Sequence, residues 1–98
     1  MNKLLTKPRS DKLYEAILAL ENVEECKQFL EDLCSISELM AMEQRYQVAS
    51  YLHQGMIYND ILSQTGASSA TISRVNRSLQ YGRGGYDIVF QRLEEKKP

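Results

Sequence analysis

The stretch that decides the fold runs from Tyr58 to Leu79 and reads YNDILSQTGASSATISRVNRSL. It contains two short runs with apolar residues at helical spacing, and the single glycine Gly66 separates them. Two short helices can cross steeply where the turn between them adopts a left-handed backbone, which glycine does without strain. Ser68 stands in the N-cap position of the second run. The stretch therefore predicts a helix-turn-helix over residues 58–80.

Helical periodicity continues on both sides of this segment. Apolar residues recur at helical spacing from Asp11, and again after Asn22 and after Ser35, each of the latter two followed three residues on by a glutamate as in a capping box. A last helix is expected from Asp87 to about Glu95, beyond the glycines that follow Tyr81. The predicted fold class is all-α, with about six helices and no strand.

Charge is distributed unevenly along the 98 residues, although the formal net charge is only −1. Residues 13–43 carry eight acidic side chains and one lysine, a net of −7, whereas residues 61–86 carry three arginines and no acid, a net of +3. A DNA-binding protein needs positive potential where phosphates lie rather than a basic average. Charge alone fits either such a surface or a chance cluster of three arginines.

Several classes of protein lack support in the sequence. Cys26 and Cys34 are expected to be reduced, buried thiols, because no export signal is recognisable at the N-terminus. His53 is the only histidine, and no catalytic or metal-binding motif surrounds it. We therefore expect no enzyme activity, no metal and no membrane span, and a cytoplasmic, nucleoid-associated protein.

The second helix of the predicted motif presents a polar face suited to the major groove. Hydroxyls and free amides at its N-terminus can contact phosphate, and small side chains there allow close approach to the bases. Arg74 is long enough to donate two hydrogen bonds to guanine, whereas Arg77 and Arg83 are better placed for phosphates. Asn76 could reach a base edge or be solvated. The predicted DNA-contacting residues are Ser68, Ser69, Ala70, Thr71, Ser73, Arg74, Asn76, Arg77 and Arg83.

The pattern Gly66-Ala-Ser followed by Ala70-Thr-Ile-Ser-Arg-Val-Asn-Arg77 and by Tyr81-Gly82 resembles the Trp-repressor superfamily, in particular its YerC/YecD-type branch. The resemblance is strong over about half the chain, from Ser35 to Tyr86. It implies an intertwined homodimer in which the two helix-turn-helix segments, here called the reading heads, face successive major grooves of DNA. Two residues depart from the motif: Leu62 stands where an alanine is usual between the helices, and Ile57 where a Ser or Thr N-cap is usual.

The resemblance also implies a possible effector pocket. In the Trp repressor two arginines sandwich the indole ring of tryptophan, and these positions correspond to Arg45 and Arg74 here. Small hydroxyl residues complete that pocket, and their counterparts here are Ser35, Thr71 and Ser78. The glycine that leaves room for the ring is replaced by Val75, whose branched side chain would occupy the space.

We therefore expect no cofactor, and tryptophan is not the expected co-repressor. Two alternatives stay open for the pocket: another small effector binds there, or Arg45 pairs with Glu43 or with another acid from the N-terminal half of the chain.

The sequence thus predicts a mobile arm over residues 1–10 and a single domain over residues 11–98. Within that domain, residues 11–55 form the dimerisation helices, residues 58–80 the helix-turn-helix and residues 86–95 the C-terminal helix. The predicted function is a bacterial transcriptional regulator, a repressor, that binds double-stranded DNA in a sequence-specific manner as a homodimer. The alternative is a protein-interaction module that keeps the helix-turn-helix shape without binding DNA.

Overall fold

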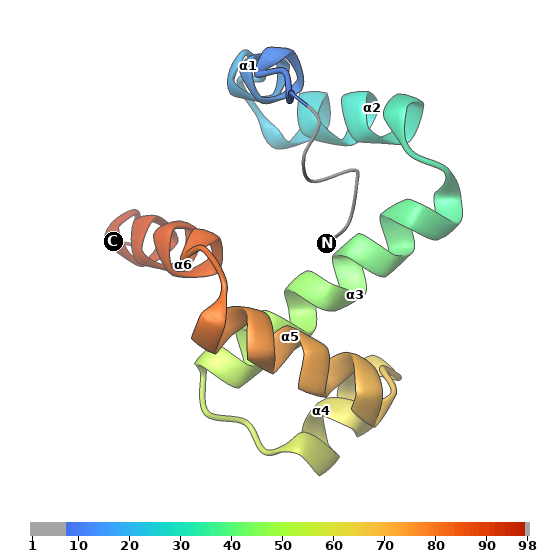
Figure 1. Ribbon diagram of the computed structural model, residues 1–98, viewed down its shortest axis with the longest axis vertical. Coiled ribbons are helices and arrows are strands. Elements are labelled where there is room, and N and C mark those ends of the chain that lie inside the picture. The colour runs from blue at the N-terminus through green and yellow to red at the C-terminus, as the bar shows by residue number, and fades with distance from the viewer. Residues whose placement is uncertain (1–7, 98) are drawn as a thin grey trace. The chain divides into compact units, whose positions relative to one another are not determined.

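The computed structural model describes residues 8–97, and residues 1–7 of the predicted arm lie outside that range. The described part contains six helices and no strand, so the prediction of an all-α fold is confirmed (Figure 1). The helices are α1 (Lys12–Leu18), α2 (Val23–Leu33), α3 (Ile36–His53), α4 (Tyr58–Thr65), α5 (Ser69–Tyr81) and α6 (Gly85–Glu95). None of the helices between residues 8 and 97 is long and apolar enough to cross a membrane.

The chain divides into two compact units, one ending at Ile36 and one beginning at Ser37. The prediction of a single domain over residues 11–98 is not tested by this division and stays a prediction.

The first unit holds α1 and α2, and its local structure follows the sequence signals closely. Asn22 caps α2, since its side chain accepts a hydrogen bond of 2.9 Å from the backbone N–H of Glu25. The Glu25 carboxylate in turn accepts from the backbone N–H of Glu21 at 2.9 Å, one residue before the position that a standard capping box uses. Neither α1 nor α2 contains a buried residue.

Apolar side chains of this first unit are therefore left in contact with solvent. Leu18 is 84% exposed and Val23 is 71% exposed. Cys26 and Cys34 are free thiols, as predicted, but they are only partly buried within the isolated chain. The expectation of buried cysteines is thus met only in part, because two short helices alone cannot enclose them.

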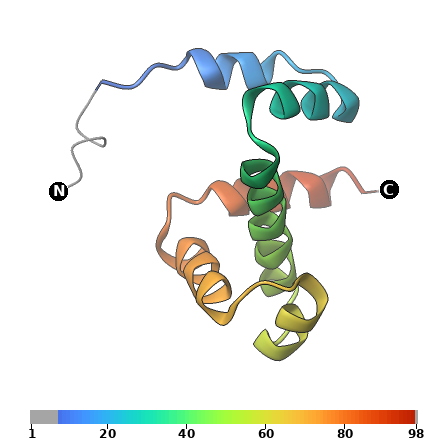
Figure 2. The same cartoon turned by 90° about the vertical axis from the view of Figure 1, so that its right-hand side faces the viewer.

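The second unit contains the hydrophobic core, and every fully buried side chain of the described residues belongs to it. Apolar side chains of α3, α4 and α5, of the turn and of α6 meet there, and none of the buried residues is polar. The core residues are Val48, Ala49, Ile61, Ala67, Ile72, Val75 and Phe90. Figure 2 shows the arrangement that results, with α4 and α5 placed around the C-terminal part of α3.

An aromatic cluster joins α6 to α3 within this unit. The Phe90 ring lies 4.6 Å from the His53 ring in a stacked geometry, 5.8 Å from that of Tyr46 and 6.0 Å from that of Tyr86, centroid to centroid. Pairs at these separations contribute about 0.5–1.5 kcal/mol beyond the area they bury. Phe90 therefore holds the C-terminal helix against the helix that begins the unit.

The turn between α4 and α5 has the backbone that the sequence predicts. Gly66 adopts a left-handed conformation with φ of +70° and ends α4, and Ser68 caps α5 by accepting from the backbone N–H of Thr71 at 3.1 Å. Ile57 begins α4 without a side-chain cap, as its apolar side chain requires. Leu62, expected between the two helices, is instead 44% exposed, because the neighbouring Ile61 occupies the buried face of α4.

The C-terminal boundary differs slightly from the prediction. Helix α5 continues to Tyr81, and α6 begins at Gly85, two residues before Asp87. Gly84 has φ of +81° and stands at the N-cap of α6, so the chain turns sharply between the two helices. The side chain of Arg83 is exposed in this connection.

Candidate DNA-binding face and arginine groove

Helix α5 separates an apolar face from a polar one. Ile72 and Val75 are buried in the core, and Leu79 packs against it from the same side of the helix. Side chains at intervals of three and four residues on the other side are all exposed. These exposed residues are Ser69, Ala70, Ser73, Arg74 and Arg77. The structure therefore brings the central predicted DNA contacts onto one accessible surface, which we call the recognition face.

The N-terminus of α5 is built differently from the rest of this face. The Ser68 hydroxyl accepts from the Thr71 backbone and also donates to the Thr71 hydroxyl oxygen at 3.1 Å. Thr71 is partly buried, so its side chain serves the start of the helix more than the surface. The backbone N–H groups of Ser69 and Ala70 lie in the first turn, where they have no partner within the helix. They are the groups at this end best suited to a phosphate oxygen.

Asn76 lies apart from the recognition face and is partly buried. Its side-chain oxygen accepts a hydrogen bond from the Gln80 side chain at 3.4 Å, one turn further along α5. A bond of this length is loose and leaves both side chains able to turn. The two roles considered for Asn76, contact with a base edge and solvation, therefore both stay open.

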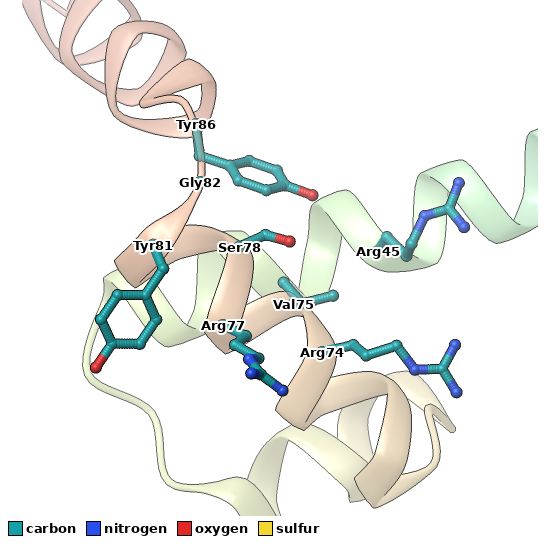
Figure 3. Close-up of a pocket in the computed structure, with 8 residues that line it drawn as sticks. All are labelled: Arg45, Arg74, Val75, Arg77, Ser78, Tyr81, Gly82 and Tyr86. Atoms are coloured by element: carbon teal, nitrogen blue, oxygen red, sulfur yellow. The ribbon is translucent and has the colours of Figure 1, made fainter. Parts of the chain in front are cut away.

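An open groove of about 550 Å³ lies beside the recognition face, between α3, α5 and the start of α6 (Figure 3). Three of its side chains are arginines, one from α3 and two from α5, and two are tyrosines. The groove is lined by Arg45, Arg74, Val75, Arg77, Ser78, Tyr81, Gly82 and Tyr86. We call it the arginine groove.

Within residues 8–97, none of the three arginines of this groove forms an ion pair with an acid. Glu94 and Lys97 form the one ion pair among residues 8–97, far along the chain from Arg45, Arg74 and Arg77. The expected alternative in which Arg45 pairs with Glu43 is therefore not seen within the described part of the chain. Figure 3 shows the side chains of Arg45 and Arg74 extending in the same direction from their two helices. The groove thus presents a local positive potential suited to an anion.

The predicted effector pocket is brought together only in part. Arg45, Arg74 and Ser78 line the arginine groove, whereas Ser35 and Thr71 do not. Val75 lines it as well, and its side chain is only 3% exposed because it packs into the core. Val75 is therefore part of the wall of the groove, and its β-branched side chain stands where the resemblance places a glycine.

Three residues of this region are absent from the sequence-based predictions. Tyr81 and Tyr86 line the groove, and Tyr81 is 81% exposed at the end of α5. Gln44 donates a hydrogen bond of 3.2 Å from its side-chain nitrogen to the carbonyl of Thr65, twenty-one residues away. The pattern YGRGGY marked the tyrosines as part of a turn, but no local signal pairs Gln44 with Thr65.

No metal site adds to this picture: between residues 8 and 97, no three His, Cys, Asp or Glu side chains are grouped so that they could hold an ion. The recognition face and the arginine groove supply hydroxyls, backbone amides and guanidinium groups. Such groups bind anionic oxygens and base edges.

Comparison with known proteins gives consistent results. Residues 9–94 match the family described as Trp repressor protein. The uncharacterized protein YerC of Bacillus subtilis (strain 168) is 46% identical over 85 residues, which cover 87% of this chain and 82% of YerC.

Two solved structures share the fold. A TrpR-like protein from Eubacterium eligens ATCC 27750 is 46% identical, with a TM-score of 0.86 over 99% of this chain and 100% of that protein. A candidate Trp repressor from Staphylococcus aureus is 48% identical, with a TM-score of 0.83 over 90% of this chain and 88% of that protein.

Proposed function

The chain belongs to the Trp repressor family, and on that basis we propose that it is a transcriptional repressor that binds double-stranded DNA in a sequence-specific manner. The family is one of DNA-binding regulators rather than enzymes. In this proposal α5 enters the major groove, and the protein acts as a homodimer in the cytoplasm, associated with the nucleoid.

The recognition face of α5 carries the proposal. Its outward side chains are small or cationic, while the opposite side of the same helix is fixed by buried Ile72 and Val75. A helix held from behind can present Arg74 to a guanine edge at a defined height, and a bidentate contact of this kind is worth about 1–3 kcal/mol of discrimination. Arg77 and Arg83, both exposed, suit the flanking phosphates.

The exposed apolar surface of the N-terminal helices supports the homodimer. In the first unit Leu18 and Val23 are largely exposed, and at the start of α3 Ile36 is 69% and Met40 is 64% exposed. Burial of one large apolar side chain is worth about 1.5–3 kcal/mol, so a second copy that covers several of them would stabilise both chains. A two-fold dimer would also present two copies of α5 to successive major grooves.

We propose that DNA binding does not depend on tryptophan. The observation behind this is the buried side chain of Val75 on the wall of the arginine groove. Isothermal titration calorimetry with L-tryptophan tests it. No saturable heat is expected, and addition of tryptophan should leave the affinity for DNA unchanged. Binding with micromolar affinity would overturn this part of the proposal.

DNA binding is tested with an operator selected from genomic fragments, by fluorescence anisotropy at several salt concentrations. Arg74→Ala should reduce the preference for the selected operator over random DNA by about ten-fold or more. Arg77→Ala should weaken binding to both DNAs similarly and lower the salt slope by about 1. Arg92→Ala, which removes an arginine of α6 outside the recognition face, is the matched control and should bind like wild type.

One result would overturn the proposal as a whole. If wild-type protein shows no salt-dependent binding to any genomic fragment, the chain is instead a protein-interaction module that keeps the shape of a helix-turn-helix. Light scattering after size exclusion tests the dimer separately, since a monomer at micromolar concentration would remove the geometric basis for two reading heads.

A further inference from the structure

We propose that Gln44 is a positioning residue for DNA reading: its side-chain amide fixes the α4–α5 turn to α3 and so sets the spacing between the two reading heads of the dimer. The inference rests on the proposed function, because it concerns how a DNA-binding dimer holds its recognition helices. On this inference, a residue of α3, which lies outside the helix-turn-helix, affects which operator the dimer prefers.

Thr65 is the point at which this connection acts. It is the last residue of α4, and the final carbonyls of a helix have no partner within that helix. Gln44 supplies the missing partner, since its Nε2 donates to the Thr65 carbonyl at 3.2 Å. The Thr65 hydroxyl donates to the Ile61 carbonyl at 2.7 Å and accepts from the backbone N–H of Ala67 at 3.1 Å. Every polar group that Thr65 can offer beyond its own N–H is thus engaged in holding the turn.

The path from Thr65 to the recognition face is short and stiff. Gly66 holds one left-handed conformation, Ala67 is only 1% exposed, and Ser68 is bonded to Thr71 through its hydroxyl. Ser69, the first residue of the recognition face, follows directly. If the Thr65 carbonyl moved, the first residues of α5 would therefore move with it by a similar distance.

The hydrogen bond adds to what apolar packing already fixes. The close-packed core residues Ile61, Ala67 and Ile72 hold the helices together. A hydrogen bond constrains both distance and angle. The Gln44 bond is partly buried, and it joins α3 to the last residue of α4, directly before the turn that leads into α5.

Helix α3 also carries the surface proposed for dimerisation. Met40 lies one turn before Gln44 on α3 and is 64% exposed, in the half of the helix proposed to contact the second chain. Gln44 therefore stands between the dimer contact and the reading head. Two heads that read successive major grooves must be about 34–36 Å apart. Adding or removing one base pair changes that separation by about 3.4 Å. A rotation of the helix-turn-helix in each subunit would therefore change the operator spacing that the dimer prefers.

The test compares Gln44→Met, which keeps length but cannot donate, with Gln47→Met as the matched control. Gln47 lies one turn further along α3, is exposed, and bonds only to the Tyr51 hydroxyl of its own helix at 3.4 Å. Affinities are measured for the selected operator, for versions with one base pair added or removed at the centre, and for random DNA. Circular dichroism and light scattering establish that each variant is folded and dimeric.

The expected result is a selective loss of spacing preference. One hydrogen bond corresponds to a factor of about 2–10 in an equilibrium constant, so Gln44→Met should lower the preference for the original spacing by about that factor. Its affinity for random DNA and its salt slope should match wild type, because no phosphate contact is removed. Gln44→Lys restores a donor and should restore the spacing preference. Gln47→Lys adds the same charge without the bond and should leave that preference as in wild type.

The outcomes separate this inference from the proposed function. A folded Gln44→Met variant with an unchanged spacing preference overturns the inference and leaves the proposed function intact. An equal loss of affinity for all DNAs, random DNA included, shows a merely structural role and overturns it as well. If Gln44→Met does not fold, Gln44→Asn replaces it, because the asparagine side chain is too short to reach the Thr65 carbonyl. The spacing preference of Gln44→Asn is then compared with that of Gln44→Lys, and the same outcomes apply. If the wild-type protein does not bind DNA at all, both the proposed function and this inference are overturned.

Discussion

Three glycines lie within four residues at the junction of α5 and α6, and the structure predicts that replacing each by alanine has a different effect on stability. A Cβ atom added at Gly82 would lie 2.4 Å from the backbone carbonyl oxygen of Ser78, closer than real Cβ contacts allow. That carbonyl already accepts the Gly82 N–H at 2.9 Å, so neither partner can move away without breaking the end of α5. Relief of such an overlap costs about 1–3 kcal/mol.

The other two glycines meet no neighbouring atom within 4 Å, so their effects come from the backbone alone. Gly84 has φ of +81°, and a left-handed conformation costs a residue with a Cβ about 1–2 kcal/mol. Gly85 is the first residue of α6 and has no positive φ. Alanine there should stabilise the protein by about 0.4–1 kcal/mol, because the unfolded chain loses freedom while the native helix is retained.

Urea denaturation followed by circular dichroism, at one fixed protomer concentration, measures the free energy of unfolding of the three variants. Gly82→Ala should lose the most, Gly84→Ala somewhat less, and Gly85→Ala should gain. Equal effects for the three variants, or a Gly82→Ala protein as stable as wild type, would refute the steric reasoning. The slope of the free energy with urea should stay constant, because the surface exposed on unfolding does not change.

Three further predictions concern packing, capping and surface charge. Phe90→Ala should destabilise the protein by about 3–5 kcal/mol, since it removes the ring that joins α6 to α3, whereas the exposed neighbour Gln91→Ala should have little effect in the same urea assay. Asn22→Ala should cost about 1 kcal/mol through loss of the α2 cap, and a loss equally large in Asn22→Asp, which keeps the acceptor, would contradict the capping role. Lys97→Ala should change the free energy of unfolding by less than about 0.5 kcal/mol, because its ion pair with Glu94 is highly exposed; a thermal melt in low and high salt checks this.

The sequence by itself determined the local structure of this protein. Helix starts at Asn22 and Ser68, and the left-handed turn at Gly66, follow from interactions between residues no more than a few positions apart. The polar face of α5 follows in the same way, because helical periodicity alone separates Ile72 and Val75 from the exposed side chains. The resemblance to the Trp-repressor superfamily rested on this same stretch, and the family match confirms it.

Tertiary structure decided what depends on contacts between distant segments. Only the packed helices show that Leu62 faces outward, that Val75 fills the wall of the arginine groove, and that Ser35 and Thr71 do not line it. No local sequence pattern predicts the hydrogen bond between Gln44 and Thr65. A polar residue on a helix gives the same pattern whether its side chain is solvated or bonded to a distant segment. Hydrogen bonds within a turn or a helix cap join residues a few positions apart, so the local sequence predicts them. Hydrogen bonds between distant residues, and steric limits such as that at Gly82, involve atoms that only the folded chain brings together.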